Sequence, residues 1–466
     1  MSTQQEPNIP VDRTKRPGPG SLPRVVLPPV QKTVLSNGLR LWLVEQHRTP
    51  QVVVSIVIPG GGTGDPPGRS GTAALTAELF DAGTGSRDAL TIAESVEFIG
   101  ASLSFRAGTD ATFGTLLALR QHLEAGLGLF ADILVNPSFP AGEFERLRKQ
   151  KLTSLMQMKD RASSVAANAF MRVLYGDDHP YGRDPSGSVA SVGSLTHEDV
   201  LTFYGENFAP RDSSLIVVGD TTLDEALPLL ERELGGWNAQ PRRPIPPMPA
   251  LPKNPARVYL IGKPGAPQSE IRIGSPALAR NSADYFAATV MNRVLGGQFS
   301  SRINLNLREK RGLTYGARSS FIFLKEPGPF VVSGAFTGAK TGEAAAELLK
   351  EIGAMHRGGV TAEELEFSRK GLTGAFALGF ETPFQIAGAL QSIILYGLAG
   401  DYYEHYIENL ASVGNDDVMR VARRAIDPSG MAVLAVGDPD EAGRGLGSLG
   451  RGDVVMLDSE GSPLHS

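Results

Sequence analysis

The sequence predicts an α+β protein of two duplicated domains, each an antiparallel-rich sheet with helices packed on one side. Three observations predict this fold. Helix-like and strand-like segments alternate irregularly, with several hairpins and no strict strand–helix–strand order. A stretch with seven prolines in sixteen residues, 240–255, divides the chain near its middle. Short patterns of the first half recur in the second half in the same order.

Composition sets the broad class of the protein. Of the 466 residues, 41% are hydrophobic and 20% are charged, so the chain can bury a sizeable core and is not disordered. The net charge of -5 lacks the basic excess of nucleic-acid-binding proteins. The longest apolar run, 52–58, is interrupted by Ser55 and is far shorter than the ~20 residues that span a bilayer. We therefore expect neither nucleic-acid binding nor a membrane span.

Cysteine is absent, which excludes disulfides, thiolate catalysis, zinc fingers and iron–sulfur ligation by this chain. The N-terminus has no basic stretch followed by an apolar stretch, so no secretory signal is visible. The cytoplasm is the expected compartment.

The first predicted elements follow a proline-rich arm at residues 1–32. Asn37 and Gly38 lie between the apolar segments 30–35 and 39–44, which is a strong hairpin signal. Residues 51–58 form a nearly continuous apolar run. Such a run predicts a strand that is covered on both faces or lies in the centre of its sheet.

Periodicity predicts the rest of the first domain, residues 33–238. Apolar residues recur at helical spacing from Leu90 to Ile99, and Gly100 is placed to end that helix. The later segments are strands at 101–107, 111–119 and 213–218, and helices at 122–134, 143–159, 164–175 and 197–208. A proline-rich linker at 239–256, a second domain at 257–438 and a weakly patterned tail at 439–466 complete the chain.

Internal repeats relate the two domains. Thr49-Pro-Gln-Val52 recurs as Ala266-Pro-Gln-Ser269, 217 residues later. The Pro and Gly-Asp punctuation of residues 209–220 recurs 218 residues later, at 427–438. Ile99-Gly-Ala-Ser-Leu-Ser104 matches Arg311-Gly-Leu-Thr-Tyr-Gly316 at an offset of 212, which pairs Leu103 with Tyr315. We expect strand 51–58 to correspond to 268–273, and strand 213–218 to 431–436.

Common catalytic motifs are missing. No two of the seven histidines have metal-ligand spacing, and neither H-E-x-x-H, H-x-x-E-H nor G-x-S-x-G occurs. Gly60-Gly-Gly-Thr-Gly64 lacks the Gly-Lys-Ser/Thr of a phosphate-binding loop and indicates a turn. His179-Pro-Tyr-Gly182 also indicates a structural turn.

One constellation stands out, at residues 292–316. Arg308 is expected near a helix end and Tyr315 on the following strand, with Gly312 making the reversal between them. A guanidinium and a phenol brought together in this way can both donate hydrogen bonds to one carbonyl. Taken alone, the pair is more simply a surface arginine and a packed tyrosine.

The wider pattern changes that interpretation. Leu295-Gly-Gly-Gln-Phe-Ser-Ser-Arg302 and Leu307-Arg-Glu-Lys-Arg-Gly-Leu-Thr-Tyr315 resemble the second-domain signature of the insulinase/pitrilysin family, the inverzincin zinc metallopeptidases. The family pattern is close to L-G-G-x-x-S-S-R followed by L-R-E-x-x-G-L-x-Y. The resemblance also includes residues 35–41, 179–182, 195–204 and 219–220, and covers about 400 residues. It implies that the two domains form half of a clamshell.

The family's zinc motif is degenerate in this chain. Aligned between Gly71 and Gly83, H-x-x-E-H falls on residues 74–78, so Ala74 and Glu78 replace the two histidine ligands and Ala77 replaces the general base. The family's third ligand is a glutamate some seventy to eighty residues further on, and the segment that begins at Lys151 has no acid. Glu78 is then a single carboxylate without a nearby partner in the sequence, and we expect this chain to bind no metal.

The resemblance implies a non-catalytic peptidase subunit, inactive alone. Arg308 and Tyr315 would bind the substrate peptide, and no residue of this chain would be catalytic by itself. The partner would be a homologous subunit that carries H-x-x-E-H and zinc, in a heterodimer or larger assembly. Two alternatives are a peptide-binding or assembly scaffold with no role in proteolysis, and a stand-alone hydrolase with an unrecognised site. A neighbouring gene that encodes H-x-x-E-H would favour the first interpretation.

Overall fold

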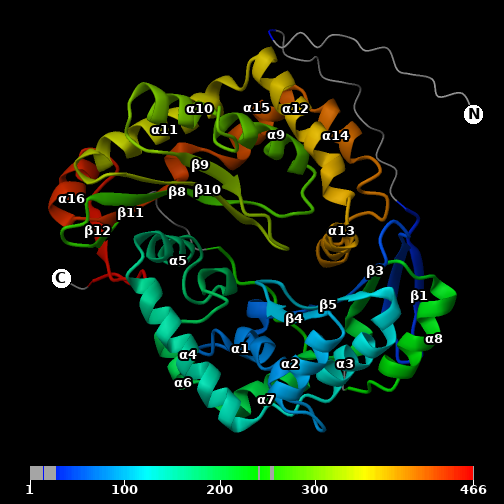
Figure 1. Cartoon of the computed structure of the whole chain (residues 1–466). Coiled ribbons are helices and arrows are strands. Elements are labelled where there is room, and N and C mark those ends of the chain that lie inside the picture. Colours follow the sequence, from blue (N-terminus) through cyan, green and yellow to red (C-terminus); the bar gives the residue numbers. More distant parts are fainter. Residues whose placement is uncertain (1–13, 15–27, 240–241, 252–256, 465–466) are drawn as a thin grey trace, which may run out of the picture.

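The computed structural model describes residue 14 and residues 28–239, 242–251 and 257–464. In these residues the chain forms one six-stranded sheet in each half, and helices surround both sheets (Figure 1). The strand orders are β1-β2-β6-β3-β5-β4 and β12-β7-β11-β8-β10-β9, and most neighbouring strands are antiparallel. The predicted α+β class with two similar domains is confirmed.

The strands lie close to the predicted segments. The first sheet contains β1 (Gln31–Val34), β2 (Arg40–Glu45), β3 (Gln51–Pro59), β4 (Ser102–Ala107), β5 (Ala111–Leu119) and β6 (Ser214–Gly219). The second sheet contains β7 (Val258–Gly262), β8 (Gln268–Leu278), β9 (Ala317–Phe321), β10 (Gly328–Thr337), β11 (Ala432–Gly437) and β12 (Val454–Leu457).

The helices of the first half include α1, α6 and α8, which the periodicity did not predict. They are α1 (Thr72–Glu78), α2 (Ala89–Phe98), α3 (Leu123–Val135), α4 (Ala141–Lys159), α5 (Ala162–Tyr175), α6 (Val189–Ser194), α7 (His197–Asn207) and α8 (Leu223–Leu234). The second half contains α9 (Tyr285–Leu295), α10 (Arg302–Asn304), α11 (Thr341–Gly358), α12 (Ala362–Phe376), α13 (Pro383–Tyr396), α14 (Tyr406–Ser412), α15 (Asn415–Ala425) and α16 (Pro439–Gly447).

The strand registers support the duplication. Val53 lies opposite Val218 in the first sheet, and Glu270 lies opposite Val436 in the second. These two pairs are related by the sequence offsets of 217 and 218. The expected correspondence of β3 with β8 and of β6 with β11 therefore holds at the level of individual residues.

The edge strands β1 and β12 differ between the two sheets, and β12 shows that one prediction was wrong. In the first sheet β1 pairs antiparallel with β2, whereas in the second sheet β12 pairs parallel with β7. The prediction of a weakly patterned tail at 439–466 was therefore wrong for its described part, 439–464, since α16 and β12 belong to the second domain. Asp438 caps α16 by accepting from the N–H groups of Asp440 (2.9 Å) and Glu441 (3.2 Å), and the many glycines of this segment hid both elements.

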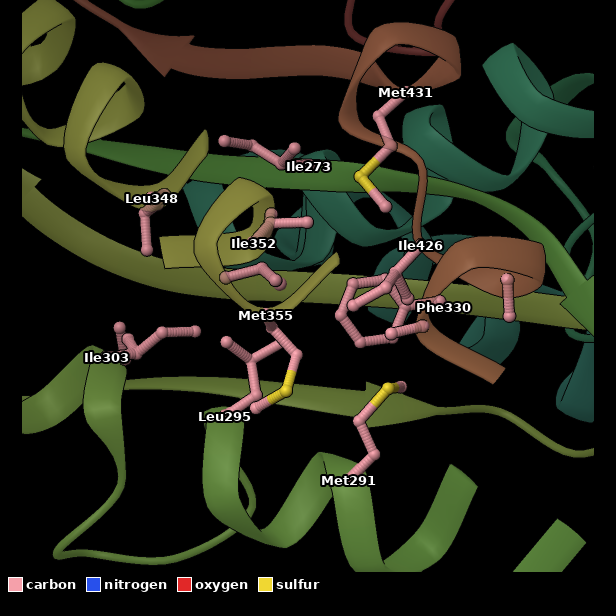
Figure 2. Packing of buried hydrophobic residues seen from close by; sticks show 14 of the residues in the cluster. Ile273, Met291, Leu295, Ile303, Phe330, Leu348, Ile352, Met355, Ile426 and Met431 are labelled. Atoms are coloured by element: carbon pink, nitrogen blue, oxygen red, sulfur yellow. The ribbon is translucent and has the colours of Figure 1, made fainter. Parts of the chain in front are cut away.

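Each sheet is covered on one face by helices of its own half. On β3 the side chains of Val52, Val54, Ile56 and Ile58 point into the core that α1, α3, α7 and α8 complete. In the second half, α9, α11 and α15 cover the corresponding face. Figure 2 shows Ile273 and Phe330 of this sheet packed among Met291, Ile352 and Met355.

The other face of each sheet is covered by a helix of the opposite half. Helix α13 of the second half lies beside the first sheet (Figure 1). Its Ile386 and Leu390 belong to one buried cluster with the β3 side chains Val53 and Val57. Helix α5 of the first half packs in the same way against β8 and β11 of the second sheet. The helices are therefore not confined to one side of each sheet, and this exchange explains why the run 51–58 is apolar at nearly every position.

The remaining predicted segments lie partly outside the described residues. The arm 1–32 is described only at residue 14 and from residue 28, and β1 already begins at Gln31. Of the linker 239–256, residues 240–241 and 252–256 lie outside the described part, and residues 242–251 contain no helix or strand. In the described part of the chain, no helix combines the length and hydrophobicity needed to cross a bilayer.

Candidate functional site

The degenerate zinc motif lies on α1, which the preceding turn holds in place. Gly71 adopts a left-handed conformation with φ of 97°, which favours glycine. The Asp65 carboxylate accepts hydrogen bonds from the N–H groups of Gly71 and Ala73, both at 2.7 Å, and so caps the helix. Burial raises the pKa of Asp65 to about 7. These contacts fix the start of α1 through groups of the chain itself.

The three motif positions differ in exposure. Ala74 and Ala77 are buried, and only Glu78 is exposed. Glu78 forms an ion pair with Lys151 of α4. Sequence reasoning missed this contact, because Lys151 lies 73 residues away in the sequence and is brought close only by the packing of α1 against α4.

These residues do not fit a zinc ion. Two of the three motif positions are alanines without donor atoms, and the third is a carboxylate already paired with an ammonium group. Zinc sites in proteins use three or four side-chain ligands. Among the described residues, no group of three or more His, Asp or Glu side chains is arranged to hold a metal ion.

The second candidate site lies between α9 and β9. After α9, the chain turns at Gly296 and Gly297 and forms α10, which continues as a π-helical turn at Leu305–Lys310. Such π-helical turns are rare in proteins, and those that occur often lie at functional sites. Arg302 anchors the segment to α12, because its Nε and Nη2 donate to the two carboxylate oxygens of Glu364 at 2.7 and 2.6 Å.

Arg308 and Tyr315 lie on either side of the chain reversal. Arg308 is in the π-helical turn, near a helix end as predicted, and Gly312 makes the reversal with φ of 61°. Tyr315 lies in a bend two residues before β9, and the prediction that it lies on that strand was wrong. The Thr314 hydroxyl donates to the carbonyl of Ala335 at 2.7 Å and accepts from the N–H group of Gly316 at 3.0 Å, which fixes the bend.

Both side chains are accessible to solvent. Tyr315 is 93% exposed, and among the described residues no hydrogen-bond partner of its hydroxyl is found. One third of the Arg308 side chain is exposed, and its Nε lies 3.6 Å from the Glu309 carboxylate. A free phenol and a weakly paired guanidinium can both donate hydrogen bonds to a bound carbonyl group.

Sequence reasoning missed Phe299, which lies in the turn before α10. The guanidinium carbon of Arg308 is 4.1 Å from the centre of the Phe299 ring, and Phe299 itself is 71% exposed. Together with Leu305, which is 47% exposed, these side chains give the rim of the second domain an exposed aromatic and cationic surface. Phe299 falls at a variable position of the resembled signature, so the signature does not point to it. The one signal in the sequence is an aromatic residue close after Gly296 and Gly297, in a turn where it would not be buried.

Family models match both halves of the chain. The model described as Insulinase (Peptidase family M16) matches residues 40–180, and the model described as Peptidase M16 inactive domain matches residues 194–372. The second match begins before β6, so its boundary differs from the division between the two sheets.

Individual proteins are similar over most of the chain. An uncharacterized zinc protease of Mycobacterium leprae is 24% identical over 408 residues, which cover 87% of this chain and 91% of that protein. The protein named non-peptidase homolog YmxG of Helicobacter pylori is 24% identical over 342 residues, with 72% and 78% covered.

Solved structures show the same fold. A peptidase M16 inactive domain from Pseudomonas fluorescens has a TM-score of 0.82 at 24% identity, with 88% of this chain and 98% of that chain covered. A protease from Helicobacter pylori has a TM-score of 0.81 at 20% identity, with 88% and 100% covered.

Proposed function

Because the chain belongs to the insulinase family of peptidases, peptidase family M16, we propose that it is a non-catalytic subunit that supplies substrate-binding groups to a zinc-bearing partner. The main support for the proposal is a difference between the two halves of the chain. The first half has lost every ligand position of the zinc motif, while Arg308 and Tyr315 of the second half remain exposed and able to donate hydrogen bonds.

The proposed role of this pair is electrostatic. In peptide hydrolysis, negative charge develops on the oxygen of the attacked carbonyl group, and donors aimed at that oxygen stabilise the transition state. The guanidinium of Arg308 and the phenol of Tyr315 would bind the peptide backbone next to the scissile bond. The zinc ion of the partner would supply the activated water, which this chain cannot supply from residues 74–78.

The partner proposed here is a homologous chain with an intact H-x-x-E-H motif, in a heterodimer or a larger assembly, and the substrate is a peptide. We also propose that this chain holds no zinc of its own. The pairing of Glu78 with Lys151 supports this, since a metal would have to displace the ammonium group and would then find only one ligand.

A tagged copy of this chain tests the proposal. It is purified from the cells in which it occurs, and the bound proteins are identified by mass spectrometry. The expected result is copurification of a chain with H-x-x-E-H, together with peptidase activity that a chelator abolishes and that neither chain shows alone. If such a partner binds but cleaves equally well without this chain, the scaffold interpretation replaces ours. A chelator-sensitive peptidase activity of this chain alone would contradict the proposal outright.

A further inference from the structure

The ion pair between Glu78 and Lys151 joins two elements that are distant in the sequence. Glu78 is the last residue of α1, and Lys151 lies in the middle of α4. The side chain of Lys151 is 15% exposed and that of Glu78 is 40% exposed, so the ammonium group lies mostly under protein. A carboxylate that pairs with such an ammonium group joins the two helices that carry them.

A second carboxylate near Lys151 belongs to the loop between α5 and α6. Burial raises the pKa of Asp184, and the charge of Lys151 is among the influences that lower it again. Asp184 accepts hydrogen bonds from the side-chain amide of Asn168 (2.6 Å) and from the N–H group of Ser186 (2.8 Å), so its position is fixed. It also lines a cavity of about 680 Å³ between α4, α5 and α6. The charge of Lys151 therefore acts on Asp184 at longer range, whereas its printed ion pair is with Glu78.

We propose that the ammonium group of Lys151 is a built-in cation that takes the structural role of a metal ion in the first half, holding α1 against α4 through Glu78. The position in the sequence agrees with this. Lys151 follows Glu78 by 73 residues, within the seventy to eighty residues that separate the zinc motif from the third ligand in the resembled family. The inference concerns the first half alone and does not depend on the role of Arg308 and Tyr315.

The substitution explains how the motif could be lost without loss of the fold. A catalytic metal ion neutralises the acidic groups of its ligands and ties their helices together. A lysine supplies one positive charge and up to three hydrogen bonds from a single covalently attached side chain. It offers no open coordination position, so the first half keeps its shape and cannot activate water.

Charge reversal tests the inference in the full-length chain. Lys151→Glu would bring a carboxylate to Glu78 and near Asp184, whereas Lys149→Glu makes the same change at an exposed position of the same helix. Melting temperatures are measured with a chelator and with added zinc chloride, and zinc binding is measured by calorimetric titration. With the chelator, we expect K151E to melt about 2–4 °C below K149E. A shift of this size is typical when a domain of 150–250 residues loses a single stabilising interaction. Added zinc should raise the melting temperature of K151E toward that of K149E and leave K149E unchanged, because paired carboxylates bind divalent cations.

Two results would overturn the proposal. One is a K151E chain that melts no lower than K149E in the chelator. The other is a wild-type chain that binds zinc tightly with one ion per chain, since the lysine would then not occupy the place of a cation. If K151E is not recovered folded, Lys151→Gln is compared with Lys149→Gln, and equal melting temperatures for these two variants would also overturn it. Lys151→Arg keeps the charge and should stay close to wild type.

Discussion

The guanidinium carbon of Arg308 lies 4.1 Å from the centre of the Phe299 ring, although the ring is 71% exposed. A cation above an aromatic face is attracted by the ring electrons, and the ring also limits the rotamers of the long arginine side chain. Phe299 is therefore a candidate positioning residue, which holds the donor where a bound peptide would meet it.

The first prediction concerns Phe299. An exposed cation–π contact is worth about 0.5–1 kcal/mol, so Phe299→Ala should lower kcat/KM of the reconstituted two-chain peptidase by about 2–5-fold. The change should leave the melting temperature unaltered, because the ring is 71% exposed. Phe299→Trp keeps an aromatic face and should restore most of the activity. A loss that tryptophan does not restore would show that the ring does not position Arg308.

The second prediction concerns the pair of donors. Removing one preorganised donor to a developing oxyanion typically costs about 3–4 kcal/mol, or 10²–10³ in kcat. Arg308→Ala and Tyr315→Phe should each lower kcat of the reconstituted peptidase in this range, with little change in KM or in partner binding. Lys310→Ala, an exposed cation two residues from Arg308, is the matched control and should have no effect. Full activity of the double variant would favour a scaffold.

Patterns that repeat along the chain predicted the sheets well. The offsets of 217 and 218 between the halves reappear in the strand pairings of Val53 with Val218 and of Glu270 with Val436. The third offset, 212, was less reliable. It pairs Gly100 with Gly312, which both adopt a left-handed conformation with φ of 61°. In the strand registers, however, Leu103 of β4 corresponds to Ala317 of β9 and not to Tyr315, because two additional residues precede β9.

Contacts between distant segments could not be predicted in this way. Periodicity shows that α5 and α13 are helices with an apolar face, but it does not show that each covers the sheet of the other half. The partnership of Glu78 with Lys151 was missed for the same reason, since it depends on how α1 packs against α4. The candidate site was predictable as far as the signature of Arg308 and Tyr315 extends, and not in its contact with Phe299.

The third prediction concerns a buried link between the halves. Tyr181 is 2% exposed, and its hydroxyl donates to Asp110 Oδ1 at 2.9 Å and accepts from the N–H group of Glu326 at 3.0 Å. The other oxygen of Asp110 accepts from the N–H group of Lys325 at 2.9 Å. Tyr181 and Asp110 belong to the first half, whereas Lys325 and Glu326 lie in the loop between β9 and β10 of the second.

Tyr181→Phe removes that hydroxyl and leaves the buried Asp110 Oδ1 without its partner, while the N–H group of Glu326 lies in an exposed residue. A buried group left unpaired costs about 1–3 kcal/mol, so the free energy of unfolding in denaturant should fall by this amount. Tyr315→Phe removes a hydroxyl that is exposed to solvent and should leave the stability unchanged. Equal stability of the two variants would mean that Asp110 and Glu326 find water or other partners instead.

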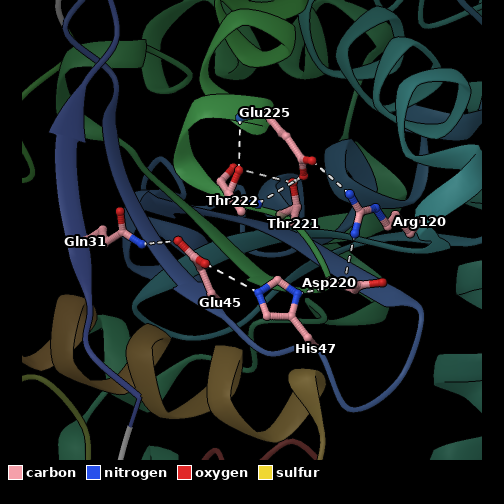
Figure 3. A network of polar contacts seen from close by, with 8 residues as sticks. All are labelled: Gln31, Glu45, His47, Arg120, Asp220, Thr221, Thr222 and Glu225. Carbon is pink, nitrogen blue, oxygen red and sulfur yellow. Dashed lines mark hydrogen bonds and ion pairs between the residues drawn. The ribbon is translucent and has the colours of Figure 1, made fainter.

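The last prediction concerns the pH dependence of a polar network at the end of β2 and β6 (Figure 3). His47 Nδ1 lies 2.7 Å from a carboxylate oxygen of Asp220, and His47 Nε2 lies 3.4 Å from Glu45. The hydrogen bond with Asp220, and then that with Glu45, raises the pKa of His47. The hydrogen bond with His47 is also the largest cause that lowers the pKa of Asp220, with a further contribution from Arg120.

The direction of the effect follows from these two shifts. The stabilisation from charged His47 is complete below about pH 6.5, the value for an unperturbed histidine, and is lost as the pH rises through the raised pKa. The stabilisation from charged Asp220 is complete above about pH 4 and is lost as the pH falls through the lowered pKa. His47→Gln should therefore destabilise the protein more at pH 5.5 than at pH 8.5, as measured by denaturant midpoints.

His122→Gln is the control, because the ring of His122 contacts Gln121 and no carboxylate. Asp220→Asn should remove most of the pH dependence of the His47 effect. The second half provides an internal comparison. Its equivalent residue, Asp438, accepts from the N–H groups of Gly265 (2.7 Å) and Asp440 (2.9 Å) and not from a histidine. If His47→Gln costs the same stability at both pH values, the histidine is held by packing and its charge contributes nothing.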